Sequence, residues 1–286
     1  MTVSQAEKAE APGKKMGDLG TRVLSALVLA PVVLAAVWFG GWFFTALLLV
    51  ACVAMAWELA GLLFGEASVR TSWFLTLTGI ASVLLAGMGL PSAALAAGGA
   101  GLAFSLAARS WTRRPLWPAL VAYLYLVTPL VALIWLRADE SLGLAVLVWL
   151  LVTVWAIDTF AYFSGRFIGG PKLAPRISPK KTWAGLLGGM AGAVVVAIGT
   201  WYWLGEGSVL ALILIAIVLT VLEQAGDFAE SALKRRAGVK DSGALIPGHG
   251  GILDRVDGLV AVAIGAALLA LVNNAANPAA GVLIWP

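Results

Sequence analysis

Long apolar segments alternate with short polar segments along nearly the whole chain. Each apolar segment has about 17 to 23 residues, the length of helix that crosses roughly 30 Å of hydrocarbon. Alternating segments of about ten residues, which are typical of a membrane β-barrel, are absent. We therefore predict an all-α, polytopic membrane helical bundle with about nine transmembrane helices. The predicted spans are residues 23–40, 42–64, 73–90, 92–108, 117–136, 142–163, 184–204, 208–226 and 258–274.

The positions of Lys and Arg test this number of spans, because a missed span would move every later loop to the other side. With the N-terminus in the cytoplasm, eighteen of the nineteen Lys and Arg fall in cytoplasmic segments, and only Arg137 falls outside. We therefore expect a cytoplasmic N-terminus and an outside C-terminus. Residues 1–21 read as a disordered cytoplasmic tail, and residues 22–286 as a single integral membrane domain.

The composition excludes an ordinary soluble domain. Apolar residues make up 61% of the 286 residues, and thirteen are Trp, far more than a core of this size needs. Cys52 is the single cysteine and lies inside an apolar segment, so the chain cannot form an internal disulfide.

Polar chemistry concentrates in residues 223–257, here called the signature segment. It holds five of the nineteen Lys and Arg, six of the fifteen Asp and Glu, and the single histidine, His249. If the preceding helix continues, Asp227, Ser231 and either Lys234 or Arg235 lie on one face. Glu230 and Lys234 can then form an ion pair beside them. Glycines that follow break the helix and allow backbone N–H groups to approach a ligand.

Two carboxylates follow this glycine-rich part of the signature segment. Asp254 and Asp257 stand three residues apart in the first turn of an apolar helix, where they suit the positive end of the helix dipole and can share a cation. The combination of carboxylates, cations and glycines indicates a metal-bound polyphosphate.

A second polar segment, residues 164–182, carries five cations and no acid. Glycines and prolines at positions 169, 170, 171 and 175 predict a structured turn region here instead of a helix. Lys180 and Lys181 come directly before the seventh predicted helix, where backbone N–H groups also attract an anion. The alternative is that these cations only fix the topology or contact anionic lipid head groups.

Four carboxylates, those of Glu58, Asp158, Glu223 and Asp227, lie within apolar segments or at their ends. A carboxylate inside a membrane is costly, which points to function, although each could instead pair with a basic residue and fix packing. In the seventh predicted helix, Gly185, Gly188, Gly189 and Gly192 repeat at the spacing of close helix packing. That face could serve internal packing or a subunit interface.

The residues from Ser231 to Asp257 resemble the signature of the phosphatidate cytidylyltransferases, the CDP-diacylglycerol synthases. The matching pattern is Ser231-x-Leu-Lys234-Arg235, then Lys240-Asp241, then Pro247-x-His249-Gly250-Gly251-Ile-x-Asp254-Arg255-Val-Asp257. Residues 178–182, 158–166 and 22–27 are also similar to that family, and residues 65–115 are least so. Ala184 stands where Glu is common in the family, which argues against an essential role for that position.

The resemblance implies that CTP and phosphatidic acid condense to CDP-diacylglycerol and pyrophosphate, with a divalent metal, on the cytoplasmic face of a membrane. We expect Mg²⁺ or another divalent cation, bound by Asp227 and Asp254, with Asp158 and Asp257 as further ligands or their partners. A second ion is compatible with four carboxylates. The expected partners are CTP, phosphatidic acid and membrane lipids, without nucleic acid, and a homodimer is possible. The expected location is a bacterial inner (plasma) membrane.

The resemblance also assigns roles to the polar residues. The predicted catalytic residues are Asp227, Asp254, Lys240, His249 and Arg255. The predicted substrate-binding residues are Ser178, Lys180, Lys181, Thr182, Ser231, Lys234, Arg235, Gly250 and Gly251.

Two other function classes remain open. Another CTP-dependent lipid-modifying enzyme, such as a lipid kinase, would share the metal and the basic residues but would release CDP instead of pyrophosphate. A secondary transporter is disfavoured, because its charges typically lie near the midplane between two related halves. Here the charges gather at one face.

Overall fold

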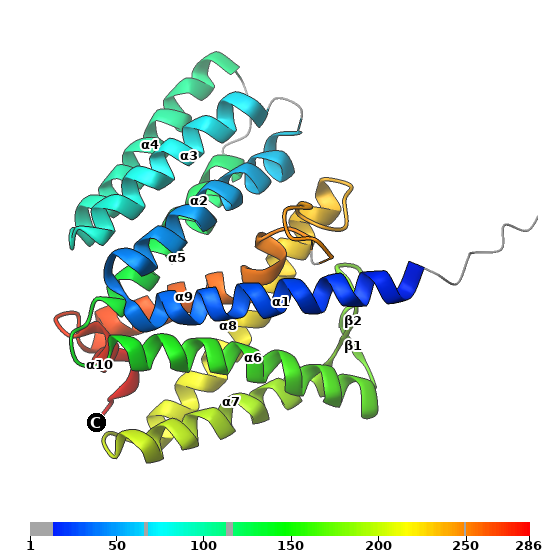
Figure 1. The fold of residues 1–286 in the computed structure, drawn as a ribbon, viewed down its shortest axis with the longest axis vertical. Coiled ribbons are helices and arrows are strands. Elements are labelled where there is room, and N and C mark those ends of the chain that lie inside the picture. The colour runs from blue at the N-terminus through cyan, green and yellow to red at the C-terminus, as the bar shows by residue number, and fades with distance from the viewer. Residues whose placement is uncertain (1–13, 66–67, 113–116, 249) are drawn as a thin grey trace, which may run out of the picture.

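The computed structural model describes residues 14–65, 68–112, 117–248 and 250–286. The described chain is helical apart from loops and one short β-hairpin (Figure 1). The elements are α1 (Lys14–Phe39), α2 (Gly41–Phe64), α3 (Ser68–Gly87), α4 (Pro91–Thr112), α5 (Trp117–Arg137), α6 (Gly143–Phe167), β1 (Lys172–Ala174), β2 (Ser178–Thr182), α7 (Trp183–Leu204), α8 (Val209–Arg236), α9 (Leu253–Asn273) and α10 (Pro278–Leu283).

Each of the nine predicted apolar segments coincides with one of the helices α1 to α9. Six of these helices, namely α2 and α5 to α9, are long and apolar enough to cross a membrane. The apolar parts of α1, α3 and α4 are shorter, at Leu27–Phe39, Ser72–Gly87 and Pro91–Ala107. The structure therefore confirms a polytopic helical membrane protein, and the larger number of spans stays a prediction.

Three helices extend beyond their predicted apolar segments, and for α8 this is the continuation on which the shared face of Asp227 and Ser231 depended. The helix α1 begins at Lys14, nine residues before its predicted apolar segment. The rest of the predicted tail, residues 1–13, lies outside the described residues. The helix α6 continues to Phe167, so the predicted turn region begins four residues late. The helix α8 continues to Arg236, ten residues past its apolar segment. In each case the helix extends into polar sequence, because adding a residue to a formed helix is easier than starting one.

The helix α5 forms the centre of the bundle. Within the described chain it is the most buried candidate span, with 67% of its apolar window inside the protein. It packs against α2, α3 and α4 on one side and against α6 and α9 on the other. Figure 1 shows α2, α3 and α4 as one group, α6 and α7 at the opposite edge, and α8 and α9 between them.

The glycine face of α7 packs inside the chain, against α6. A methyl group at Gly192 would lie 2.8 Å from the Phe160 ring and 3.0 Å from the Ala156 carbonyl oxygen, and one at Gly188 would collide with Ser164. Of the two uses that the sequence allowed, the structure therefore selects internal packing. This close contact places the beginning of α7 beside the end of α6.

The hairpin β1–β2 connects these two helices. Its strands are antiparallel and pair Lys172 with Thr182 and Ala174 with Ser178. The Thr182 hydroxyl accepts a hydrogen bond of 3.0 Å from Gly185 N–H and so caps the N-terminus of α7. The hairpin and the loop between α8 and α9 emerge at the same end of the bundle, and α10 with the C-terminus lies at the other end (Figure 1).

Candidate active site

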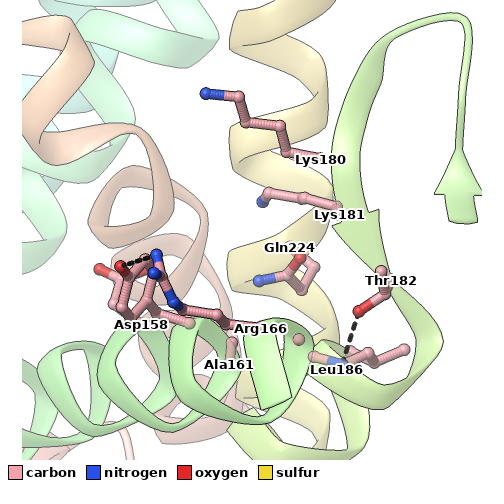
Figure 2. A pocket seen from close by; sticks show the side chains of 11 residues that line it. Asp158, Ala161, Arg166, Lys180, Lys181, Thr182, Leu186 and Gln224 are labelled. Carbon is pink, nitrogen blue, oxygen red and sulfur yellow. Dashed lines mark hydrogen bonds between the residues drawn. The ribbon is translucent and has the colours of Figure 1, made fainter. Parts of the chain in front are cut away.

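A cavity of about 320 Å³ opens between α6, β2, α7 and α8. Figure 2 shows Lys180 and Lys181 leaving β2 towards the same side, with Asp158 and Arg166 below them on α6. The lining residues are Asp158, Ala161, Tyr162, Gly165, Arg166, Lys180, Lys181, Thr182, Gly185, Leu186 and Gln224. Three cations and one carboxylate therefore line this cavity, together with uncharged residues.

Lys181 joins the hairpin to α8. Its ammonium group forms an ion pair with Asp227 and lies 4.9 Å from the centroid of the Phe228 ring. The other oxygen of Asp227 accepts a hydrogen bond of 3.2 Å from the Ser231 hydroxyl, one helical turn later. The predicted face of Asp227 and Ser231 is thus confirmed, and the two polar segments of the sequence meet at Asp227.

Three carboxylates from three helices gather around this ion pair. Asp158 of α6, Asp227 of α8 and Asp257 of α9 lie within electrostatic range of one another and of Lys181. The helices α8 and α9 touch closely here, since a methyl group at Gly226 would lie only 2.6 Å from the Asp257 carbonyl oxygen. Close helix contact thus brings like charges together, although their mutual repulsion opposes it.

Asp254 belongs to a second group of contacts. One of its oxygens accepts a hydrogen bond of 2.6 Å from Lys234. The other accepts bonds from Ser242 N–H at 2.9 Å, the Ser242 hydroxyl at 3.0 Å and Gly251 N–H at 2.8 Å. Lys234 also forms the predicted ion pair with Glu230. The structure therefore groups Asp227 with Asp158 and Asp257, and Asp254 with Lys234 and the signature loop.

The remaining predicted residues lie around these two groups. Lys240 and Arg235 are exposed, and Arg255 is exposed within electrostatic range of Asp158. Gly250 accepts a backbone hydrogen bond from Ile246 within the loop, and Ser178 lies in β2. His249 lies outside the described residues. The assigned roles of all these residues in binding and catalysis stay predictions.

Two side chains at the site were not assigned a role from the sequence. Gln224 lines the cavity and donates a hydrogen bond of 2.6 Å to buried Glu223. The sequence feature that could have identified Gln224 is its polar amide, one turn before Asp227 in an apolar helix. Glu58 was noticed as an intramembrane carboxylate, but nothing local indicated that it would bind the loop before α9.

The donor set suits a divalent cation that also binds substrate. Among the described residues, no group of three or more His, Cys, Asp or Glu side chains is close enough to hold an ion alone. Magnesium is typically held by one or two carboxylates together with substrate phosphates and waters. The carboxylates of Asp158, Asp227 and Asp257, in range of one another beside a cation-lined cavity, fit that arrangement.

Comparison with known proteins identifies relatives over most of the chain. The model of the cytidylyltransferase family matches residues 20–272. A Brucella abortus protein named phosphatidate cytidylyltransferase is 40% identical over 261 residues, which span 87% of this chain and 92% of that protein. A protein of the same name from Haemophilus influenzae is 38% identical over 170 residues, which cover 56% of this chain and 59% of that protein. Another from Staphylococcus haemolyticus is 43% identical over 126 residues, which cover 44% of this chain and 48% of that protein.

Proposed function

Because this chain belongs to the cytidylyltransferase family, we propose that it transfers the cytidylyl group of CTP to phosphatidic acid, giving CDP-diacylglycerol. The relatives that span most of the chain carry a name with this activity. The structural observation that supports it most directly is the cavity in which Arg166, Lys180 and Lys181 face Asp158. A triphosphate needs several cations within reach, and this cavity supplies them from two elements.

The proposed reaction needs positioning and charge more than covalent chemistry by the protein. A phosphate oxygen of phosphatidic acid forms a bond to the α-phosphorus of CTP. The bond from that phosphorus to the oxygen shared with the β-phosphorus breaks, and pyrophosphate leaves. Lys180 and Lys181 hold the triphosphate and offset the charge that grows on the leaving group. No general base is required, because the attacking phosphate is already ionised near neutral pH.

We further propose that the enzyme depends on Mg²⁺ or a similar divalent ion. When bound, the ion would neutralise phosphate charge and orient the triphosphate. Asp227 would hold it together with Asp158 or Asp257, which lie within electrostatic range. Asp254 stays a predicted ligand whose oxygens accept bonds from Lys234, Ser242 and Gly251 in this structure.

The proposed site faces the cytoplasm, with nine membrane crossings. Two observations support this proposal. The hairpin and the loop between α8 and α9, which carry many of the basic residues, emerge at one end of the bundle (Figure 1). Arg137, the single Lys or Arg expected outside, ends α5 two residues before Asp139, which accepts a hydrogen bond from Ala279 N–H of α10 at the other end. A reporter fused after Pro286 should therefore report the outside, and one inserted in residues 235–245 the cytoplasm. A cytoplasmic C-terminus would exclude nine crossings. A homodimer would have to use surfaces other than the glycine face of α7, which α6 occupies.

The decisive experiment follows the phosphorus atoms of CTP. Purified protein in detergent is incubated with phosphatidic acid, magnesium and CTP that is labelled either at the α-phosphate or at the γ-phosphate. The proposed function predicts that only the α-label enters the lipid and that the γ-label leaves as pyrophosphate. A CTP-dependent lipid kinase would instead place the γ-label in the lipid. If neither label entered the lipid, both enzymes would be contradicted.

A further inference from the structure

The carboxylate of Glu58 lies in α2, yet its hydrogen bonds go to the loop that precedes α9. Its side chain is buried, with 4% of the residue exposed. One oxygen accepts a bond of 2.9 Å from Ile252 N–H, and the other accepts a bond of 2.9 Å from Leu253 N–H. Among the described residues Ile252, at the N-cap of α9, makes no side-chain cap bond of its own. Glu58 therefore caps α9 from almost two hundred residues away.

The signature loop is shaped to admit this carboxylate. A methyl group at Gly243 would lie 2.7 Å from one Glu58 oxygen, and a methyl group at Gly251 would lie 2.5 Å from the other. Both positions must lack a side chain for the loop backbone to come this close to Glu58. Two glycines of the signature segment are thus explained by a residue of α2.

Ser242 connects Glu58 to Asp254. Its hydroxyl oxygen lies 3.0 Å from a Glu58 oxygen and 3.0 Å from an Asp254 oxygen. The backbone N–H of Ser242 also donates to Asp254, over 2.9 Å. On its far side Asp254 is bound by Lys234. A continuous chain of contacts therefore runs from α2 through the loop to a predicted catalytic carboxylate and its lysine.

We propose that Glu58 is a positioning residue for nucleotidyl transfer. It fixes the loop around Ser242 and Gly251, and this loop orients Asp254. The proposal rests on the proposed function, because it assigns Glu58 a part in that reaction. If Glu58 were purely structural, substituting it would lower only the stability of the fold. If Glu58 positions the loop, substituting it lowers the turnover rate of protein that is still folded, since an error of about 1 Å in a catalytic group can lower turnover about 100-fold.

The first test compares Glu58→Gln with Asp139→Asn. The Gln amide would place an N–H donor opposite the donors of Ile252, Leu253 or Ser242. Asp139→Asn is the matched control, because Asp139 also accepts backbone N–H bonds, from Leu142 and Ala279, at the other end of the bundle. We expect kcat per folded Glu58→Gln protein to fall about 10- to 100-fold. The apparent KM for CTP should rise less than kcat falls, since Lys180 and Lys181 come from the hairpin and only Lys240 comes from this loop. Asp139→Asn should keep the wild-type kcat well below its melting temperature.

A second readout does not depend on activity. Lys240 is exposed in the signature loop, so limited trypsin digestion reports how firmly the loop is held. Glu58→Gln should be cut there faster than the wild type, and Asp139→Asn at the wild-type rate. Cleavage of both variants at the wild-type rate would contradict a loop held by Glu58.

A double-mutant cycle with Ser242→Ala tests the route through the loop. If Glu58 acts through Ser242, each substitution lowers kcat, and the two effects together are smaller than their product. Asp139→Asn and Ser242→Ala should combine without such coupling. Full turnover in folded Glu58→Gln protein would overturn the proposal; if that variant does not fold, full turnover in Ser242→Ala would overturn it. A wild-type enzyme that forms no CDP-diacylglycerol would instead refute the proposed function.

Discussion

Two clusters of charged residues, one at each end of the bundle, are held in different ways. At the end that carries α10, Arg137 donates to the carbonyl oxygens of Val37 at 2.7 Å and Trp38 at 2.9 Å. Asp139 accepts from the N–H groups of Ser141, Leu142 and Ala279, each at 3.0 Å. These charges are satisfied by backbone groups at turns and helix ends. At the cavity end, Asp158, Asp227 and Asp257 instead lie in range of one another, with Lys181 among them.

The difference predicts that the first cluster stabilises the fold and that the second takes part in the proposed reaction. Burial alone would raise the pKa of Asp139, but its hydrogen bonds outweigh burial and bring that pKa below its ordinary value. The Asp139 carboxylate therefore favours the folded state. Clustered carboxylates repel one another and oppose folding, so we expect the cluster of Asp158, Asp227 and Asp257 to serve a bound ligand and not stability. Substitutions at the two ends should accordingly change different measured quantities.

The largest expected effect is at Asp227. Asp227→Asn keeps the shape of the side chain and removes its charge, so product formation should fall at least about 100-fold while the protein still folds and inserts. The measurement is transfer of α-labelled CTP to lipid by protein that elutes normally in size-exclusion chromatography. Asp254→Asn should lose similar activity, and chelation of divalent ions should inactivate the wild type reversibly. Near-normal turnover in either variant would remove that residue from the proposed metal site.

A smaller effect on activity is expected at the cations. Lys181→Ala removes the ion-pair partner of Asp227 and a phosphate contact, so the apparent KM for CTP should rise and kcat should fall, together about 10- to 100-fold in kcat/KM. Lys240→Ala, in the exposed loop, should act in the same direction. Steady-state kinetics with varied CTP measures both. Wild-type kinetics in both variants would leave these lysines with a role in topology alone.

At the opposite end, substitutions should lower stability and spare activity. Arg137→Gln loses part of the cap on the last carbonyl groups of α1, and Asp139→Asn loses acceptors for backbone N–H groups. Each should destabilise the protein by roughly 1 kcal/mol, since both side chains are partly exposed to solvent. Thermal unfolding in detergent measures the change, and the α-label assay at low temperature provides the control. A large loss of turnover in folded Arg137→Gln protein would contradict the prediction that charges at this end stabilise the fold without taking part in the reaction.

The smallest expected effect is a pH dependence of stability. Because the folded-state pKa of Asp139 is lowered, its contribution is fully present above the unfolded value of about 3.9 and disappears as the pH falls through the folded-state value. Between about pH 5 and pH 3, the melting temperature of the wild type should therefore fall more than that of Asp139→Asn. Equal slopes for the two proteins would show that Asp139 does not contribute in this range.

The sequence by itself determined the helices and the family. All nine apolar segments became helices, because a run of apolar residues and its spacing are local properties that the backbone turns directly into structure. The same local periodicity predicted the contact of Asp227 with Ser231 and the ion pair of Glu230 with Lys234. The resemblance in the signature segment is confirmed by the family match over residues 20–272.

Only the tertiary structure decided which distant charges meet. It placed Lys181 on Asp227, grouped Asp227 with Asp158 and Asp257, and seated the loop before α9 on Glu58. These contacts depend on where helices cross, and the crossings depend on close approach at residues such as Gly226 and Gly192. A periodic pattern identifies the face of each helix. It does not say which other helix that face contacts, or at what height along the helix. Those two properties decide which carboxylates lie together beside the cavity and which one binds the loop before α9.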